Sequence, residues 1–353
     1  MRRFLLTIAV GVLFVGSTAG PALACGGLIG RNGSVNLVRT TTLAGYHDGV
    51  EHYVTSFQFA GAGGEFGSIV PLPGVPTNVE RGGDWTLQRL VREVDPPERD
   101  ALADGVRTLA GAASAEVLLE KQIDALDLTV LRGGAQAVGE WATAHGFLLT
   151  PDAPEVLDFY ASRSPIFLAA RFNADAARER GVALGDGTPV HLTIPTENPW
   201  VPLRILGLGR VQAERVNADV FLLTDRRPAL LPGADAPGLE LGRQERASST
   251  LLDDLRSDKG MSWIPASSWL THLRVDASPA DLTYDLAVDV SGAGQPSAAA
   301  AGLPAGSSGL AAGGSGNAWP VVVGAGLGVF ALLAGVAIVA TTTRSRRGTG
   351  QRA

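Results

Sequence analysis

The sequence predicts a mixed α+β domain, with a mostly antiparallel sheet and several short helices, followed by one C-terminal transmembrane helix. Three observations lead to this fold class. Two β-rich runs are joined by a tight turn near the amino terminus, strands and helices alternate through the middle, and the last apolar stretch is long enough to cross a bilayer. Strands separated by helices and long connections argue against an all-β sandwich.

Residues 1–24 have the pattern of a secretory signal peptide. A short basic segment precedes an uncharged apolar run, 4–15, and small residues stand before the expected cleavage site, which follows Ala24. The run is shorter than the roughly 20 residues of a spanning helix, so an uncleaved anchor is the less favoured alternative. Cleavage makes Cys25 the first mature residue and a candidate for lipidation. Because Ala22 stands where a lipobox usually has leucine, we expect ordinary cleavage.

The mature chain should begin with a β-hairpin. Two runs rich in β-branched and aromatic residues, 35–46 and 50–59, flank the tripeptide His47-Asp48-Gly49. A further strand is expected at 66–72, after a glycine-rich turn. The first third of the domain is therefore predicted to be mainly sheet.

An amphipathic helix is expected after Asp84, an N-cap residue, because apolar residues recur at helical spacing from Leu87 to Val94. The middle of the chain then alternates. Its expected strands lie at 117–123, 128–131, 165–172, 189–194, 201–208 and 220–224, and its expected helices at 135–145 and 154–162. The order of the strands does not follow from the sequence.

Three segments are expected beyond the folded part, 25–290. Residues 291–318 are almost wholly Gly, Ala, Ser and Pro, which predicts a flexible linker. Residues 319–341 carry no charge and have the length of a transmembrane helix. The tail, 342–353, has four arginines and no acid, so the positive-inside rule places it in the cytoplasm. The sequence thus predicts a single-pass protein of the cell membrane with its domain outside.

The expected transmembrane helix carries small residues on one side. Gly324 and Gly328 form a GxxxG pair, and Gly335 continues the small-residue surface. Helices in lipid associate through close backbone approach, so this surface would permit a homodimer. Glycine and alanine are common throughout the chain, and chance composition is the stronger alternative. The expected partners are the membrane, through this helix, and an envelope protein, the wall or a lipid.

Composition and spacing limit the function classes. A net charge of −6 gives no broad basic surface, so no nucleic-acid partner is expected. Cys25 is the only cysteine, which excludes an intrachain disulfide. The histidines show no HExxH spacing, and we expect neither a cofactor nor a metal. His47 and His52, with Asp48 and Glu51, form the nearest metal-like grouping, but a solvated hairpin tip explains them equally well.

Motifs assign no catalytic residue. The chain has no G-x-S-x-G elbow, and the adjacent acids Asp253 and Asp254, on a predicted helix, point in different directions as surface residues do. Trp263 and Trp269 could form a ligand platform, but burial in the core is the more common arrangement. His145 lies at the end of a predicted helix, where a partly positive ring interacts favourably with the helix dipole.

The middle third resembles a known family. The likeness is carried by Leu128 to Leu131, Trp141, His145 to Phe147, Tyr160, Phe167 to Ala170 and Pro202 to Arg204. These residues resemble the bacterial domain-of-unknown-function 2330 family, whose members look like exported proteins, over about 25–225. The resemblance implies export and the extent of the domain but no catalytic residue. Members often have a second cysteine near the first, which this chain lacks, so no family disulfide carries over.

Two function classes follow from these observations. We favour a membrane-anchored, extracytoplasmic and non-catalytic binding or interaction module of the bacterial cell envelope. The alternative is a surface enzyme of the hydrolase class, with a site assembled from distant residues. An enzyme would show a concave pocket with ionisable groups within hydrogen-bond reach of one another, whereas a flat polar surface would favour the module.

Overall fold

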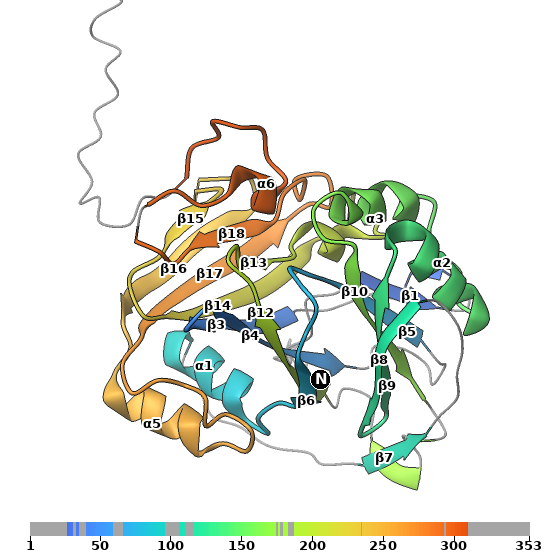
Figure 1. Ribbon diagram of the computed structural model, residues 1–353, viewed down its shortest axis with the longest axis horizontal. Helices are drawn as coiled ribbons and strands as arrows, with labels where there is room; N and C mark the ends of the chain where they lie inside the picture. The colour runs from blue at the N-terminus through green and yellow to red at the C-terminus, as the bar shows by residue number, and fades with distance from the viewer. Residues whose placement is uncertain are drawn as a thin grey trace, which may run out of the picture. The chain divides into compact units, whose positions relative to one another are not determined.

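The computed structural model describes most of the predicted domain (Figure 1). The described residues are 27–30, 33–34, 40–58, 66–95, 106–109, 116–173, 176, 179–182, 187–233, 235–292 and 294–309. The expected cleavage site after Ala24, the lipidation candidate Cys25 and the expected transmembrane helix with Gly324, Gly328 and Gly335 lie outside these ranges. Within the ranges, no helix is long and apolar enough to cross a membrane.

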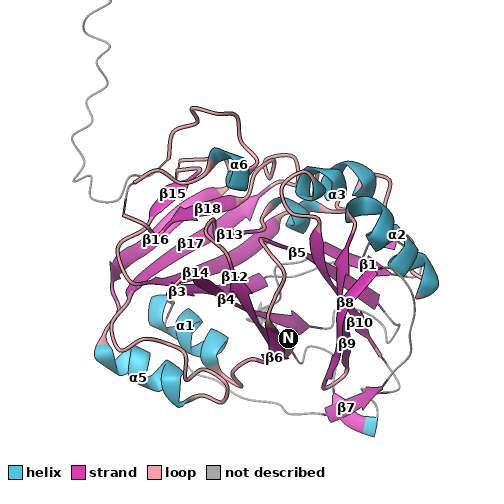
Figure 2. Cartoon of the chain, viewed as in Figure 1, coloured by secondary structure: helices cyan, strands magenta, loops and turns pink. Residues whose placement is uncertain are grey.

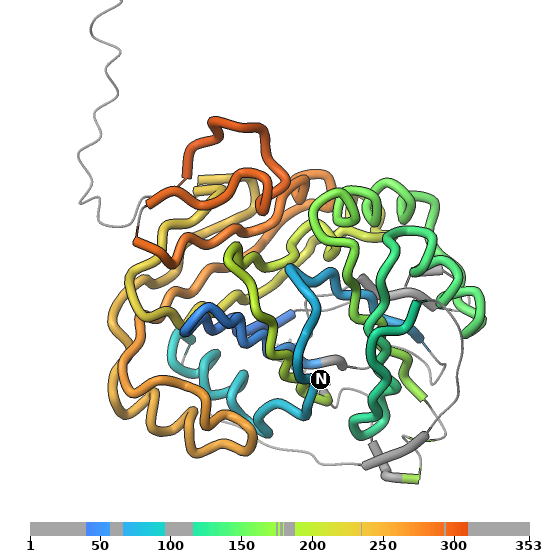
Figure 3. Tube along the Cα trace, viewed as in Figure 1, coloured from blue at the N-terminus to red at the C-terminus, as the bar shows by residue number. Residues whose placement is uncertain are grey.

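A seven-stranded sheet joins the two halves of the chain. Its order is β16-β17-β14-β3-β4-β12-β6, and β14 pairs with β3 in parallel although the two strands are far apart in sequence (Figure 3). The other described pairs of this sheet are antiparallel. The bounds are β3 Thr40–His47, β4 Val50–Gln58, β6 Asn78–Arg81, β12 Gly187–Pro195, β14 Val216–Thr224, β16 Leu239–Arg246 and β17 Trp269–Ala277.

A second, six-stranded sheet is antiparallel, in the order β2-β1-β5-β10-β9-β8. Its strands are β1 Gly27–Gly30, β2 Gly33–Ser34, β5 Phe66–Leu72, β8 Glu116–Ile123, β9 Leu126–Arg132 and β10 Ile166–Phe172. Two small sheets have the orders β13-β18-β15 and β11-β7. Their strands are β7 Val106–Leu109, β11 Arg180–Val182, β13 Trp200–Val201, β15 Ala229–Leu231 and β18 Leu286–Asp289.

Helices cover one face of each large sheet (Figure 2). Buried leucines of α1, Thr86–Val94, and α5, Ser249–Ser257, pack on the seven-stranded sheet. Helices α2, Gly134–Ala144, and α3, Ala153–Ala161, pack on the six-stranded sheet. The opposite faces of the two sheets contribute to one shared apolar cluster. Strands buried on both faces account for the long apolar runs in the sequence.

The predicted α+β architecture with mostly antiparallel sheets is confirmed. Asp48 and Gly49 form the predicted hairpin turn with φ values of 50° and 79°. This left-handed conformation gives a two-residue turn the twist of its strands. Strand β5 has the predicted bounds 66–72, and both helices of the middle third form within a residue or so of their predicted ends.

The prediction of a strand at 201–208 is wrong. Only its first residue belongs to a strand, β13, and the chain then forms the 3₁₀ helix η1, Arg204–Gly207. The backbone N–H groups of residues 203 and 204 turn inward and donate to the buried carboxylate of Asp285, at 2.7 and 3.0 Å. Because these groups bond to a side chain, they are not available to a sheet.

The first part of the expected linker, 291–318, packs on the domain. Helix α6, Ala298–Ala301, begins at the N-cap Ser297, and Ala301 is fully buried. Gly302 then passes the ring of Phe159 so closely that a Cβ would clash with it. Small residues therefore serve close packing here, where a flexible linker was expected.

The amino-terminal end of α1 is held by a carboxylate from far along the chain. Trp85 is the N-cap residue in place of Asp84, and its side chain makes no capping hydrogen bond. Instead Asp258, after α5, accepts the N–H groups of residues 84–86 at 2.8 to 3.0 Å. Gly83 is needed beside it, because a Cβ there would clash with the carboxylate. The cap of this helix is thus a tertiary contact.

Replacing Asp258 by alanine should lower the free energy of unfolding by about 2–3 kcal/mol, because three N–H groups lose a charged acceptor. Urea denaturation of the two proteins measures the difference. The matched control is Asp253→Ala on α5, an exposed change that should cost under about 0.5 kcal/mol. Equal losses in the two variants would contradict the capping role.

Candidate functional site

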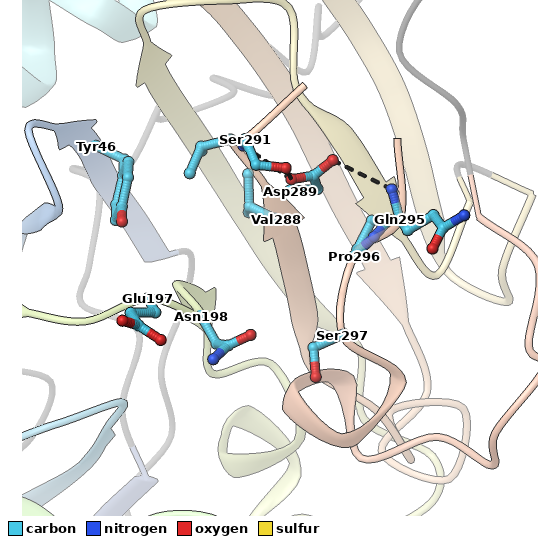
Figure 4. A pocket seen from close by; sticks show the side chains of 10 residues that line it. Tyr46, Glu197, Asn198, Val288, Asp289, Ser291, Gln295, Pro296 and Ser297 are labelled. Atoms are coloured by element: carbon cyan, nitrogen blue, oxygen red, sulfur yellow. Dashed lines mark hydrogen bonds between the residues drawn. The ribbon is translucent and has the colours of Figure 1, made fainter. Parts of the chain in front are cut away.

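An open pocket lies between the end of β3 and the turn after β18 (Figure 4). Its volume is about 250 Å³. It is lined by Tyr46, Glu197, Asn198, Val288, Asp289, Val290, Ser291, Gln295, Pro296 and Ser297. None of these ten lining residues is a lysine or an arginine, and two are acids. The pocket therefore offers hydrogen-bonding groups in a negatively charged setting.

Asp289 shapes one side of the pocket. Its carboxylate accepts the N–H and hydroxyl of Ser291 at 2.8 and 2.6 Å. It also accepts the N–H groups of Gly294 and Gln295 at 2.5 and 3.1 Å (Figure 4). Burial by itself would raise the pKa of Asp289, but these donors favour the carboxylate and hold the pKa below its ordinary value. The loop after β18 is thus folded around a fixed negative charge.

Tyr46 and Glu197 form the other side of the pocket (Figure 4). The Tyr46 hydroxyl donates to the carbonyl oxygen of Thr196 at 2.8 Å. Burial raises the pKa of Tyr46, and the charges of Glu51 and Glu197 raise it further. The phenol therefore stays protonated at neutral pH and fixed in orientation.

The carboxyl group of Glu51 lies behind Tyr46. Glu51 stands opposite Tyr46 in the β3–β4 register and is 1 % exposed. Neither carboxyl oxygen has a hydrogen-bond partner in the part of the chain that the structure describes. Burial raises the pKa of Glu51 to about 8, and the nearby backbone N–H of Trp200, which lacks hydrogen-bond geometry, offsets burial only in part. Glu51 is therefore mostly neutral at pH 7.

A much smaller cavity adjoins Glu51. Its volume is about 10 Å³, which is space for one water-sized group. It is lined by Ala44, Tyr46, Glu51, Pro199, Trp200, Val201, Leu222, Thr224 and Val288. Tyr46 and Val288 line both cavities, so the small cavity and the open pocket adjoin at these two residues.

A histidine pair occupies the opposite face of the same sheet. His52 Nδ1 lies 2.9 Å from His191 Nε2, and His191 Nδ1 lies 3.2 Å from a carboxylate oxygen of Glu80. Glu80 stands directly opposite His191 in the β6–β12 register. The indole of Trp263 stacks on His52 with ring centroids 4.1 Å apart, and Gly45 leaves the space that the indole fills.

Both imidazoles of the pair are neutral at pH 7. Burial lowers the pKa of His52 to about 4, with a further contribution from His191. Burial also lowers the pKa of His191, although Glu80 opposes the shift. When His191 Nδ1–H donates to Glu80, His191 Nε2 accepts from His52 Nδ1–H. The three residues thus form an oriented hydrogen-bond relay.

The metal-like grouping that the hairpin sequence offered as an alternative does not form. Successive strand residues face opposite sides, so Glu51 and His52 point away from each other. His47 Nδ1 instead lies 2.8 Å from a carboxylate oxygen of Asp225. His145 Nδ1 bonds a backbone carbonyl of α2 at 2.8 Å. Across the described ranges, no group of three or more His, Cys, Asp or Glu side chains could hold a metal ion.

The two tryptophans near α5 do not form one platform. Trp263 lies on the histidine pair, whereas Trp269 is contacted by the guanidinium of Arg246. Asp253 and Asp254 lie on the exposed surface, where each forms an ion pair with an arginine. None of these residues lines the open pocket or the small cavity.

Sequence reasoning did not name Asp289, which lines the open pocket, and it named Glu51 only in the hairpin grouping and not as a residue of a cavity. A signal for Glu51 was present, because strand alternation places it on the face of Tyr53, which carries the larger apolar surface of this strand. The sequence contained no such signal for Asp289, because the residues that donate hydrogen bonds to it lie in the following segment, which has the composition of a linker. The relay of Glu80 and His191 likewise depends on the pairing of distant strands.

Comparison with known proteins gives one family. A family model described as "Uncharacterized protein conserved in bacteria (DUF2330)" matches residues 19–288. No curated protein matches significantly. Among solved structures, baculovirus P35 matches at 9 % identity with a TM-score of 0.37, over 72 % of this chain and 97 % of that one. A caspase-8/P35 complex matches at 7 % identity with a TM-score of 0.36, over 71 % and 95 %. At this level of similarity, no property of these proteins is transferred to this chain.

Glu51 predicts a pH dependence of stability. Its pKa is raised from 4.5 to about 8 on folding, so the folded state binds the proton more tightly than the unfolded state. The stability that this proton gives is complete below pH 4.5 and is lost as the pH rises towards 8, by up to about 1.4 kcal/mol per pH unit. Glu51→Gln should remove this loss.

Urea denaturation between about pH 5 and pH 8 measures the effect. The free energy of unfolding of Glu51→Gln, taken relative to the wild type, should rise with pH over this range. The test compares how the free energy of unfolding changes with pH in the two proteins. A destabilisation by the glutamine amide that is the same at every pH does not affect this comparison. Glu240→Gln, an exposed change on β16, is the control and should leave the slope unaltered. A difference that stays constant with pH would show that Glu51 does not hold a proton in the folded protein.

Proposed function

Because the chain belongs to the DUF2330 family of uncharacterized bacterial proteins, we propose that it is a non-catalytic binding module of the cell envelope that takes a small polar ligand. The ligand occupies the pocket between Tyr46 and Asp289. The observation that carries the proposal is this open pocket of about 250 Å³, whose polar walls are held in place by their own hydrogen bonds. The hydrogen bonds of its ionisable groups Tyr46 and Asp289 go to backbone groups and to Ser291 and not to one another, unlike the ionisable groups expected of an enzyme.

The pocket suits binding because its walls are ordered before a ligand arrives. Four donors hold the Asp289 carboxylate, and a backbone carbonyl holds the Tyr46 hydroxyl. Groups that are already fixed lose little freedom on binding. Glu197, Asn198 and Gln295 add a carboxylate and two amides to the lining (Figure 4). A ligand with hydroxyl, amide or ammonium groups complements these walls, whereas an anion would be repelled.

The two ends of the sequence support a place in the envelope. Residues 1–24 have the features of a signal peptide, and 319–341 are apolar and precede the basic tail 342–353. We propose that export and this membrane helix hold the domain outside the cytoplasm. A wall component, a lipid headgroup or an envelope protein is then the available partner.

The surface enzyme is a second candidate, favoured by the relay of Glu80, His191 and His52. These groups come from three strands and lie in hydrogen-bond contact, as a site assembled from distant residues would. The relay nevertheless lies on the face of the sheet opposite to Glu51. With a pKa of about 4, His52 is also a much weaker base than the pKa near 7 that general-base catalysis favours. Binding is therefore the first candidate.

The mature protein should begin at Cys25, with the domain outside and the tail in the cytoplasm. Protease added to spheroplasts should digest the domain and leave an epitope fused to residue 353 intact. Amino-terminal sequencing should find Cys25 first, and the intact mass should lack a diacylglyceryl group. Protection of the domain together with cleavage of the epitope would overturn the orientation.

The pocket should bind small polar probes, and blocking it should remove the binding. We expect ligand-observed NMR to detect N-acetylglucosamine, D-alanine or ethanolamine on the wild-type protein. Asn198→Trp places an indole at the exposed edge of the pocket and should weaken that binding at least about tenfold, or 1.4 kcal/mol. Val211→Trp, in an exposed loop before β14, is the matched control and should bind like the wild type. Absence of binding by all three probes, or equal binding by both variants, would refute the proposal.

A further inference from the structure

We infer that the pocket recognises a primary amine, whose ammonium group enters the small cavity between Tyr46 and Val288 and binds the carboxylate of Glu51. The inference rests on the proposed binding function and names its ligand class. Two independent observations carry it: a buried carboxyl group without a partner, and a cavity of ammonium size beside that group.

Glu51 differs from the other buried acids of the domain. The side chains of Asp219, Asp258, Asp285 and Asp289 each form at least one hydrogen bond. Neither carboxyl oxygen of Glu51 has a hydrogen-bond partner among the described residues. Leaving a buried polar group unpaired is costly, so its presence calls for a physical reason. A ligand that brings its own donors supplies one.

The cavity beside Glu51 has the size and the walls for an ammonium group. About 10 Å³ accommodates one water-sized group, and a primary ammonium head is of that size. A trimethylammonium head is several times larger and does not fit. Tyr46 and Trp200 are among the residues that line the cavity, and aromatic rings attract cations. The remainder of the ligand lies in the open pocket, which Tyr46 and Val288 also line.

The charged side chains that line the two cavities favour a cation. Glu51 lies at the inner end, and Glu197 and Asp289 lie in the open pocket, while no lysine or arginine is among the residues that line either cavity. The titratable groups facing Glu51 are Tyr46 from β3 and, beyond it, Glu197. The strands β13, β14 and β18 present groups that do not titrate: Trp200, Val201, Leu222, Thr224 and Val288.

Binding of an ammonium group requires Glu51 to lose its proton. The folded carboxyl is mostly protonated at pH 7, because its pKa is about 8. As the ligand enters, the carboxyl O–H bond breaks, the proton passes to solvent, and the ammonium N–H groups donate to the carboxylate oxygens. Binding at pH 7 therefore releases close to one proton for each ligand. The affinity should rise with pH up to the pKa of Glu51 and fall once the amine itself is deprotonated.

Isothermal titration calorimetry of the full-length protein with ethanolamine tests the inference. Titrations at pH 7 in two buffers of different ionisation enthalpy should show release of about one proton, and the affinity at pH 8 should be about fivefold higher than at pH 7. Choline and ethylene glycol should bind at least about tenfold more weakly than ethanolamine. Choline binding as tight as that of ethanolamine, or ethanolamine binding without proton release, would overturn the inference.

Glu51→Gln keeps the size of the side chain and removes its charge. It should weaken ethanolamine binding at least about tenfold and abolish proton release, whereas Glu240→Gln should change neither. The pH dependence of ethanolamine binding is measured on the wild-type protein. The inference can therefore be tested even if Glu51→Gln folds poorly. If Glu51→Gln binds ethanolamine as the wild type does, the amine inference fails and the binding function stands. If the wild type binds no probe at all, both fail.

A further arm distinguishes two sources of the amine. Glycerophosphoethanolamine is the soluble head of a phospholipid and carries the same ammonium group. Tighter binding of this compound than of ethanolamine, with the same proton release, supports the inference and points to a lipid headgroup. Weaker binding with the same proton release supports it and points to a free amine. Equal binding of either compound by wild type and Glu51→Gln would overturn it.

Discussion

The buried carboxylate of Asp285 is the contact on which the pocket side of the fold depends. It is 0 % exposed, and its oxygens accept the Tyr160 hydroxyl at 2.8 Å, the N–H groups of residues 203 and 204, and the Arg163 guanidinium at 2.6 Å. A buried charge is tolerated when its lone pairs are used in this way. Helix α3, the turn η1 and strand β18 therefore meet at one point, and β18 carries Val288 and Asp289 to the pocket.

Strand β4 carries two unrelated polar arrangements because its side chains alternate. Glu51 faces the side of the sheet where Trp200 and β18 cover it, and His52 faces the side where Trp263 lies. Adjacent residues thereby acquire opposite environments. The carboxyl becomes a proton-holding group with a pKa of about 8, and the imidazole becomes a neutral member of a relay with a pKa of about 4. The backbone of one sheet separates the two, so the pocket and the relay are distinct sites.

Local sequence signals predicted much of the fold, and the failures share a cause. Strand β5 and the Asp48-Gly49 turn follow from patterns a few residues long, so their predictions are confirmed. The cap of α1 is different, because Asp258 stands 174 residues from Asp84 in the sequence. Likewise the segment 201–208 turns toward Asp285, and the alanine-rich start of 291–318 packs on α3. In each case a partner from elsewhere in the chain overrides the local preference.

The sequence by itself determined the family, the α+β class, the hairpin and the helices of the middle third, since each depends on short-range periodicity or turn chemistry. The sequence interpretation left Glu51 in a solvated hairpin tip or a metal-like grouping. Only the tertiary structure showed that Glu51 is buried. The Glu51 cavity needs Trp200 and Val288, which the pairing of β13 with β18 holds in place. The pKa of Glu51 depends on its desolvation, and desolvation is a property of packing that residue order alone does not contain.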